Sequence, residues 1–216
     1  LLSGTKGAIG YATSTDGIAW TKNVANPVFV AGAGDVWDKY GVDSPAVIKN
    51  SPTGYEMWYT GISVNYTAAL GLLSAVNFAD VDNVITSATT IAIGHATSTN
   101  GTTWTKDPAN PVLTKGAGAS WDKYGVGAPT VVKTGSTYQL WYTGVSLSLN
   151  TLSNIVNPGA VLQNVVIAGT NMGIGHAVST NGALWTKDIA NPVVTRGTSL
   201  AWNGLGVGAP SVAQVG

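Results

Sequence analysis

The sequence of 216 residues contains no cysteine, which excludes disulfide bonds, thiolate metal sites and cysteine nucleophiles. Charged residues make up only 9% of the chain, against about a quarter in an average domain. Ten basic residues balance ten acidic ones, so no excess of positive charge predicts binding to nucleic acid or to an anionic membrane. No apolar run approaches the roughly 18 residues of a membrane-spanning helix, and we expect no membrane span.

Glycine, tryptophan and tyrosine are abundant instead, with 28, 8 and 8 copies. Aromatic and β-branched residues fit a pleated surface and glycine suits turns, whereas residues that favour long helices are scarce. This composition predicts an all-β fold. A surface rich in Ser, Thr, Asn and Gly and poor in charge is typical of an extracellular or cell-surface protein. The chain starts at Leu1 without a visible signal peptide, so we interpret it as a mature or trimmed piece of something longer.

One stretch of twelve residues occurs three times, as "IGYATSTDGIAW" (9–20), "IGHATSTNGTTW" (93–104) and "IGHAVSTNGALW" (174–185). The tryptophans that end the copies are 84 and 81 residues apart, and three copies of the surrounding unit agree over most of their length. Each copy has Asp-Gly or Asn-Gly between two short apolar runs. These dipeptides tolerate positive φ and are the strongest short hairpin signals, so the repeated stretch predicts a β-hairpin.

The complete unit predicts four antiparallel strands, which in the third section of the chain cover 128–135, 137–145, 172–179 and 183–187. Four-stranded units in tandem are typical of the blades of a β-propeller. One hairpin cannot bury its apolar side alone, so neighbouring units are expected to cover each other. We predict an all-β propeller of four-stranded antiparallel blades, with about three tandem repeats in this chain.

As a single propeller segment, residues 1–216 divide into four parts. Residues 7–22 supply the last two strands of one blade, 44–106 and 127–187 are complete blades, and 208–216 supply the first strand of another. Propellers have about 4–8 blades, so this chain is not expected to close a ring alone. Either a longer parent chain or a homo-oligomer would complete it.

The order of motifs in "DSPAVIKNSPTGYEMWYTG" (43–61) and "IGHATSTNGTTW" resembles that of the five-bladed propellers of glycoside hydrolase families 32, 43 and 62. The resemblance covers most of the chain except the long connectors. It implies catalytic carboxylates around the axis, at the starts of the innermost strands. Asp43 is the only residue that matches such a position, where the other copies have Gly127 and Gly208.

Glycoside hydrolysis normally needs two carboxyl groups, one to protonate the leaving oxygen and one as base or nucleophile. The resemblance therefore implies Asp43 as a general base or a sugar-binding carboxylate; the alternative is that it caps the turn before Ser-Pro. The single glutamate, Glu56, lies on a second strand where the next copy has Gln139, and no family-type acid glutamate is visible.

A second group of candidate ligand-binding residues comes from the repeated sequence "WDKYG" and its third copy. Tryptophans there could stack on sugar rings or pack the linkers between blades, and aspartates could contact a ligand or form Asx turns. The candidates are Trp37, Trp121, Trp202, Asp38 and Asp122.

His95 and His176 correspond to Tyr11 in the first copy. A metal site would not accept tyrosine easily, so we interpret both histidines as hydrogen-bonded structural residues and expect no metal site and no cofactor. Asp80 and Asp82 are the only charges in the apolar connector 62–90, and a structural calcium site there is a weak alternative. The connectors 62–90 and 145–171 are long enough to be structured or functional.

Three functions remain open from the sequence. The preferred one is a non-catalytic extracellular propeller for assembly, adhesion or glycan recognition, with carbohydrate or other protein chains as partners. The second is a glycoside hydrolase similar to family 43, acting on an arabinan or xylan type of substrate, with Asp43 as general base. The third is a purely structural repeat of a surface layer, a filament or an engineered protein. Whether the chain is an enzyme stays undecided, with the balance toward no.

Overall fold

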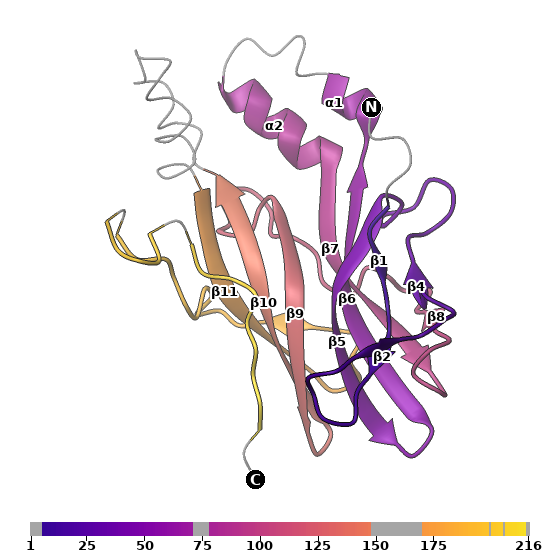
Figure 1. Cartoon of the computed structure of the whole chain (residues 1–216). Helices are drawn as coiled ribbons and strands as arrows, with labels where there is room; N and C mark the ends of the chain where they lie inside the picture. Colours follow the sequence, from indigo (N-terminus) through magenta and orange to yellow (C-terminus); the bar gives the residue numbers. More distant parts are fainter. Residues whose placement is uncertain (1–5, 71–77, 148–169, 199, 205, 215–216) are drawn as a thin grey trace.

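Two antiparallel four-stranded sheets dominate the computed structural model, which describes residues 6–70, 78–147, 170–198, 200–204 and 206–214 (Figure 1). The first sheet consists of β5 (Gly41–Ser51), β6 (Gly54–Val64), β7 (Thr89–Ser98) and β8 (Thr105–Lys106). The second consists of β9 (Gly125–Thr134), β10 (Thr137–Leu147), β11 (Thr170–Ser179) and β12 (Thr186–Lys187). In each sheet the spatial order of the strands follows the chain. The expected all-β character is confirmed for both sheets.

Four shorter strands lie near the N-terminus. β1 (Ala8–Ile9) pairs with β4 (Phe29–Val30), and β2 (Ala12–Thr13) pairs with β3 (Thr21–Lys22). This N-terminal segment contacts β5 through β1 and β4. It contains the first copy of the repeated hairpin, in the part of the chain that was expected to supply two outer strands.

Equivalent residues of the two sheets occupy the same register. Trp58 lies opposite His95 in the first sheet, and Trp141 lies opposite His176 in the second. The inner strand of each sheet is the first in sequence, β5 or β9. Each contains a bulge where it pairs with the second strand of its sheet, β6 or β10. Because alternating side chains point to opposite faces of a strand, this shared register gives the sheets the same pair of faces.

The connector 62–90 contains two helices, α1 (Tyr66–Ala69) and α2 (Phe78–Ala88), which composition did not predict. Asn65 caps α1 by accepting a hydrogen bond from the Ala68 backbone N–H. Lys123 forms an ion pair with Asp82 of α2, at 2.9 Å, and Lys115 donates to the Thr86 and Thr89 carbonyls at the end of the helix. Local capping and tertiary contacts therefore outweigh the β-rich composition here. Most of the second connector, 148–169, lies outside the described residues.

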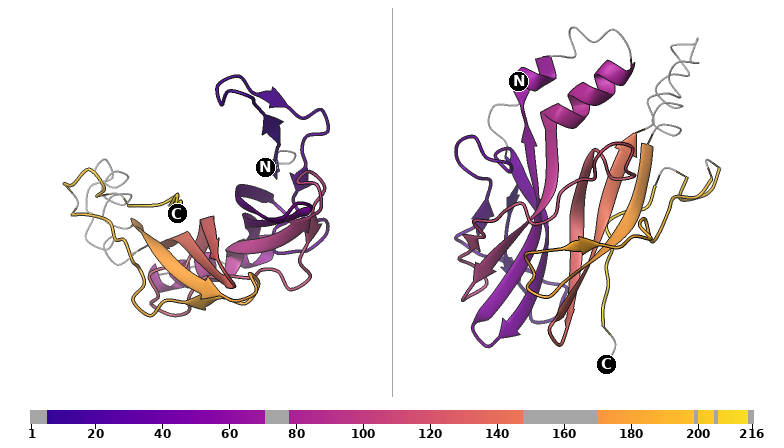
Figure 2. Two further views of the ribbon diagram at one scale, coloured as in Figure 1. Left: turned by 90° about the horizontal axis from the view of Figure 1, so that it is seen from below. Right: turned by 180° about the vertical axis from the view of Figure 1, so that it is seen from behind.

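The hydrophobic core consists of two clusters. One lies between the two sheets and includes Trp58, Ile93, Leu140 and Tyr142. The other joins the first sheet to the N-terminal segment and is formed by Ile9, Phe29, Val42, Met57, Tyr59 and Ala96. Viewed from below, the N-terminal segment and the two sheets follow an arc (Figure 2). Each element therefore covers one face of its neighbour, as expected for strands that cannot bury their apolar side alone.

A strand was expected at 208–216, a range of which the structure describes 208–214. Residues 206–214 form no strand, because the described chain offers no neighbouring strand with which a ladder of hydrogen bonds could form. The segment is held against the second sheet by three hydrogen bonds: from the Val207 N–H to the Met172 carbonyl, from the Ala209 N–H to Thr143 Oγ1 and from Thr134 Oγ1 to Gln214.

Within the described ranges, neither helix is long and apolar enough to cross a membrane.

Candidate functional sites

The starts of the inner strands have an unusual backbone conformation that recurs three times. Ser44, Ala128 and Ala209 have φ values of 47°, 46° and 50°, and each precedes a proline. Positive φ is unfavourable for residues with a side chain, and a following proline restricts the backbone further, so each position costs on the order of 1–3 kcal/mol. Such a conformation persists only where the surrounding structure enforces it.

Threonines of the preceding sheet hold two of these positions. Thr60 Oγ1 accepts a hydrogen bond of 2.9 Å from the Ala128 N–H, and Thr143 Oγ1 accepts one of 2.8 Å from the Ala209 N–H. Both threonines are buried. The second strand of one sheet thus fixes the inner strand start of the next repeat.

This contact explains why the three copies differ at the predicted catalytic position. A Cβ at Gly127 would lie 2.8 Å from Thr60 Cγ2, and one at Gly208 would lie 3.0 Å from Thr143 Cγ2. The first distance is shorter than real contacts of a Cβ and the second is tighter than most, so a side chain at either position would force the threonine to shift. Asp43 has no such neighbour in the described chain and is exposed. The inner strands therefore present a single carboxylate.

Asp43 also differs from the other carboxylates in having no partner. In the described chain its side chain makes no hydrogen bond or ion pair, whereas the other aspartates with described side chains and the only glutamate each interact with a neighbouring group. An exposed carboxylate without an internal role is free to contact a ligand.

Glu56 cannot supply the second carboxyl group beside Asp43. Asp43 lies opposite Thr60 on β6, and Glu56 is four residues further along that strand, about 13 Å away at the usual rise per residue. The two carboxyl groups of glycosidases are separated by roughly 5–10 Å. Glu56 is moreover held by Tyr138 and Asn50.

Trp37 and Trp121 lie in the loops before β5 and β9, and each packs against the sheet that follows it. The indole of Trp37 packs against Gly61 and Gly94, where a Cβ on either glycine would overlap the ring. Trp121 occupies the same place against Gly144 and Gly175. The rings also pack against tyrosines, at 5.8 Å between ring centroids in both sheets. This placement favours the packing interpretation for these two residues, and a role in ligand binding stays a prediction.

Trp202 is placed differently, with 95% of its surface exposed. Its two counterparts each lie on glycines of the second and third strands of the sheet that follows them in sequence. The described residues after Trp202 form no such strands. Among the described residues the rings of Trp37 and Trp121 contact tyrosines and not Trp202, so the three indoles do not form one platform there.

Asp38 and Asp122 are almost completely buried, at 2% and 1% exposure. Each forms an ion pair of 2.5 Å with a lysine of the last strand of its sheet, Lys106 or Lys187. Asp122 also accepts a hydrogen bond of 3.1 Å from the Gly116 N–H. A buried pair of this kind ties the loop before the inner strand to the outer edge, which gives these aspartates a structural role in the described chain.

The buried tyrosines beside these pairs remain protonated. Burial is the main cause that raises the pKa of Tyr59 above its usual value, and the nearby Asp38 carboxylate raises it further. The same two causes raise the pKa of Tyr142 beside Asp122. Each hydroxyl therefore stays a hydrogen-bond donor at all physiological pH values.

A polar cluster that the sequence did not predict surrounds His95, which is buried between two acidic residues. Its Nδ1 lies 3.1 Å from Asp107 Oδ2, and its Nε2 lies 3.7 Å from Glu56 Oε1, an ion-pair distance that is too long for a hydrogen bond. Tyr138 of the second sheet donates a hydrogen bond of 3.0 Å to Glu56. The cluster therefore links the two sheets.

The charges in this cluster act on one another. Burial is the largest single influence on His95 and lowers its pKa, but the interactions with Glu56 and Asp107 together outweigh it, so the pKa lies above its usual value. Burial raises the pKa of Glu56, and the contacts with His95, Asn50 and Tyr138 outweigh it, so the net change is downward. The geometry thus favours a protonated imidazole between two carboxylates.

The sequence contained a signal for part of this cluster. His95 and Asp107 recur as His176 and Asp188, 3.4 Å apart, whereas the first copy has Tyr11 and Asn23 at these positions. The histidine and the aspartate are present together and replaced together, which is typical of an interacting pair. The interpretation of both histidines as structural residues agrees with these contacts.

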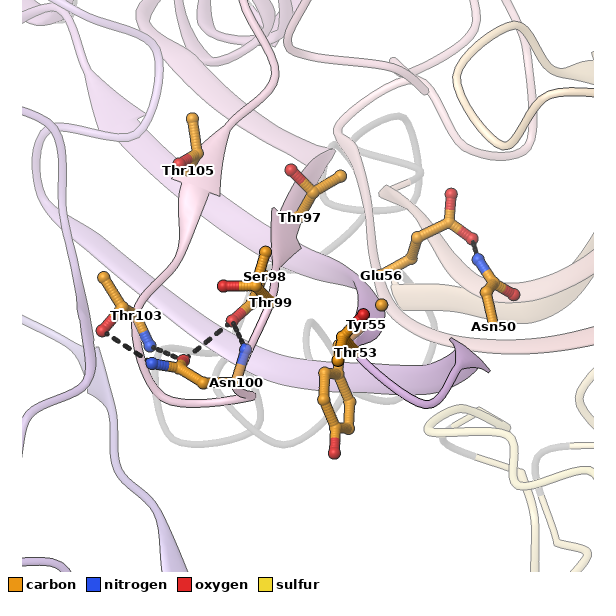
Figure 3. Close-up of a pocket in the computed structure, with 11 residues that line it drawn as sticks. Asn50, Thr53, Tyr55, Glu56, Thr97, Ser98, Thr99, Asn100, Thr103 and Thr105 are labelled. Atoms are coloured by element: carbon orange, nitrogen blue, oxygen red, sulfur yellow. Dashed lines mark hydrogen bonds between the residues drawn. The ribbon is translucent and has the colours of Figure 1, made fainter.

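A polar hollow of about 470 Å³ lies beside Glu56, between the β5–β6 turn and the β7–β8 turn (Figure 3). Figure 3 shows the Asn50 amide against the Glu56 carboxylate and the Asn100 side chain folded into its own turn. Hydroxyl groups of threonines and an aromatic ring line the rest of it, from Thr53, Tyr55, Thr97, Thr99, Thr103 and Thr105. Such a surface can accept hydrogen bonds from a small polar ligand.

Among the described residues, no group of three or more His, Asp or Glu side chains is placed to hold a metal ion. Asp82, part of the calcium alternative, is paired with Lys123 and accepts a hydrogen bond from Tyr124. A calcium site in this connector stays a prediction without support from these contacts.

Comparisons with known proteins give similarity in fold. No protein family model matches the chain, and no curated protein matches it. Among solved structures, a family 117 glycoside hydrolase from the marine bacterium Zobellia galactanivorans is similar with a TM-score of 0.54 at 18% identity, over 88% of this chain and 44% of that one. A second structure, described as a glycoside hydrolase, matches with a TM-score of 0.54 at 16% identity, over 88% of this chain and 45% of the other. The chain has the type of fold found in these hydrolases and spans less than half of their length.

Proposed function

We propose that this chain is part of a β-propeller that binds a glycan at the Asp43 end of its inner strands without hydrolysing it. Similarity in fold to glycoside hydrolases suggests a glycan as the ligand class by analogy only, because one fold can carry many functions and the residues of the site must carry the argument. An extracellular or cell-surface location is part of the proposal and would expose the site to polysaccharides.

The proposal rests on the surroundings of Asp43. It is exposed, it has no partner in the described chain, and it lies directly before the constrained residue Ser44. A carboxylate in such a place accepts hydrogen bonds from sugar hydroxyls. Strained backbone of the kind found at Ser44 is often located at binding sites.

The absence of hydrolysis follows from the number of carboxylates. Threonine packing disfavours a side chain at Gly127 and Gly208, and Glu56 is too distant. In the described chain Asp43 therefore lacks the second carboxyl group that acid–base cleavage of a glycosidic bond requires.

A glycoside hydrolase with Asp43 as general base is the second candidate. One observation favours it: the chain covers 44% and 45% of the two hydrolases it resembles, so a catalytic acid can come from sequence beyond this chain. A purely structural repeat is the third candidate, and the shared register of the two sheets supports it.

Binding to a glycan array, followed by calorimetric titration with the best oligosaccharide, tests the proposal. Asp43→Asn keeps the shape and removes the charge, and we expect it to weaken binding at least tenfold. Asp35→Asn, at an exposed loop position, serves as the matched control and should bind like the wild type. Absence of binding to any glycan would refute the proposal.

A parallel assay for release of sugars from arabinan, xylan and fructan separates the first two candidates. We expect no release by the wild type. Release that Asp43→Asn abolishes would replace the binding function by the hydrolase.

A further inference from the structure

The contact between the two sheets shows how the outward face of one repeat is covered by the hairpin of the next. Trp58, at 0% exposure, donates a hydrogen bond of 2.8 Å from Nε1 to the Gly182 carbonyl. The Trp185 ring meets it edge-on, at 6.1 Å between centroids. A Cβ at Gly182 would lie 2.9 Å from the Trp58 ring, so this position requires glycine for close approach as well as for its φ of 75°.

The equivalent face of the second sheet lacks this cover. Trp141, the counterpart of Trp58, is only half-buried, and its Nε1–H has no partner among the described residues. His176 and Ile174 are also only partly buried, although the corresponding residues of the first sheet are buried. Val178 of the same strand is 40% exposed. The segment 206–214 touches this sheet at Thr134, Thr143 and Met172 and leaves the tryptophan open.

The hairpin at 14–20 is built like the covering hairpin but covers nothing in the described chain. Its Gly17 N–H donates to Ser14 Oγ at 2.9 Å, and Trp20 Nε1 donates to the Gly17 carbonyl at 3.1 Å. The same two bonds in the 179–185 hairpin measure 2.9 and 3.0 Å. Trp20 is 62% exposed, and a Cβ on Gly17 would meet no atom within 4 Å.

We propose that a second copy of this chain seats its Ser14–Trp20 hairpin on the Trp141 face of the second sheet. Trp141 Nε1 then donates to the Gly17 carbonyl, and Trp20 meets the Trp141 ring edge-on, as Trp58, Gly182 and Trp185 do within one chain. This contact between two copies would repeat the contact that joins the two sheets within one chain. It does not depend on the proposed glycan site.

The geometry predicts a head-to-tail contact, because the face and the hairpin lie on opposite ends of the arc (Figure 2). Contacts of this heterologous type extend from copy to copy and close into a ring only if the rotation between copies permits. One hairpin on one sheet face is a small interface, so the association should be weak and concentration-dependent.

Sedimentation velocity over a range from about 1 µM to several hundred micromolar, where small interfaces associate, tests this inference. We expect the sedimentation coefficient of the wild type to rise with concentration. Trp141→Phe removes the N–H donor, and Gly17→Asn places a side chain where the contact leaves no room. Both variants should weaken association at least tenfold.

Gly34→Asn is the matched control, because Gly34 has a φ of 77° and open space around its Cβ, like Gly17. Asparagine tolerates this backbone region, so both glycine variants should unfold at the same temperature. Gly34→Asn should associate like the wild type. A wild-type chain that stays monomeric overturns the inference. Association that Trp141→Phe weakens and Gly17→Asn does not also overturns it, since the face would then bind something other than the hairpin.

Discussion

The two four-stranded sheets are built to one plan but differ in their surroundings. Both place a tryptophan on a pair of glycines, both bury an aspartate against a lysine of the outer strand, and both begin with a constrained residue before proline. The first sheet has a neighbour on each face, and the second has the described chain on one face and a short segment on the other. The repeat thus determines the sheet, and its neighbours determine how much of it is buried.

The largest expected effect is on stability, and it distinguishes the covered face of the first sheet from the uncovered face of the second. Trp58→Ala should lower the free energy of unfolding by about 4 kcal/mol, because it removes a buried ring and its hydrogen bond to Gly182. Trp141→Ala, at the half-buried counterpart, should cost about 1 kcal/mol, since large losses come from fully buried side chains. Urea unfolding of both variants measures the difference. Equal losses would contradict the assignment of covered and uncovered faces.

The next largest effect concerns a feature that the sheets share. Asp122→Ala leaves the Lys187 ammonium partly buried without its partner, and we expect a loss of about 3 kcal/mol. Asp38→Ala should cost a similar amount in the first sheet. The same unfolding experiment applies, and a loss below about 0.5 kcal/mol in either variant, as for an ordinary surface substitution, would refute the structural role of these aspartates.

A smaller effect on stability is expected at the starts of the inner strands, where the first sheet has Asp43 and the second has Gly127. Gly127→Asp introduces a side chain against Thr60, so the second sheet should lose about 2 kcal/mol through overpacking. Asp43→Gly, the reverse exchange in the first sheet, should leave stability nearly unchanged because the exposed Asp43 side chain makes no hydrogen bond or ion pair with the described residues. Thermal unfolding compares the two. A stable Gly127→Asp protein would show that packing does not restrict the carboxylate to the first sheet.

The smallest effect depends on pH and on Glu56, for which the second sheet has Gln139. The pKa of His95 is raised in the folded protein, so its contribution to stability is present below its unfolded pKa near 6.5 and is lost as the pH rises through the folded value. The lowered pKa of Glu56 contributes in the opposite direction, above its unfolded value near 4.5.

Stability should therefore decline as the pH rises above about 6.5, the unfolded pKa of histidine. Glu56→Gln should reduce this decline in stability, and His95→Gln should remove the contribution of His95 to it. Urea unfolding at a series of pH values measures both effects. An unchanged slope in both variants would contradict the role of the cluster.

Much of the fold could be predicted from the sequence because three copies of one unit show which positions are shared. The hairpin turn at Asn100-Gly101 and the aromatic strand around Trp141 follow from turn chemistry and alternation, which are local. The helices α1 and α2 could not be predicted this way. Lys115 and Lys123 of a distant loop contact α2, and no local pattern reports such contacts.

The candidate site was predictable in part. The position of Asp43 follows from the alignment of the copies, but the reason for Gly127 is the Thr60 side chain of another sheet, which appears only in three dimensions. Trp37 and Trp121 could be platforms or packing residues on sequence grounds. The glycines beneath them, from two different strands, favour packing.

The most direct test of the account is a titration followed by the backbone amide resonances in NMR. With an oligosaccharide that the glycan array identifies, we predict shifts in residues 41–46 and none in the equivalent residues 125–130. The shifts should vanish in the Asp43→Gly variant, which makes the first sheet resemble the second. Shifts at 125–130, or binding by Asp43→Gly as strong as by the wild type, would contradict the claim that one free carboxylate forms the site.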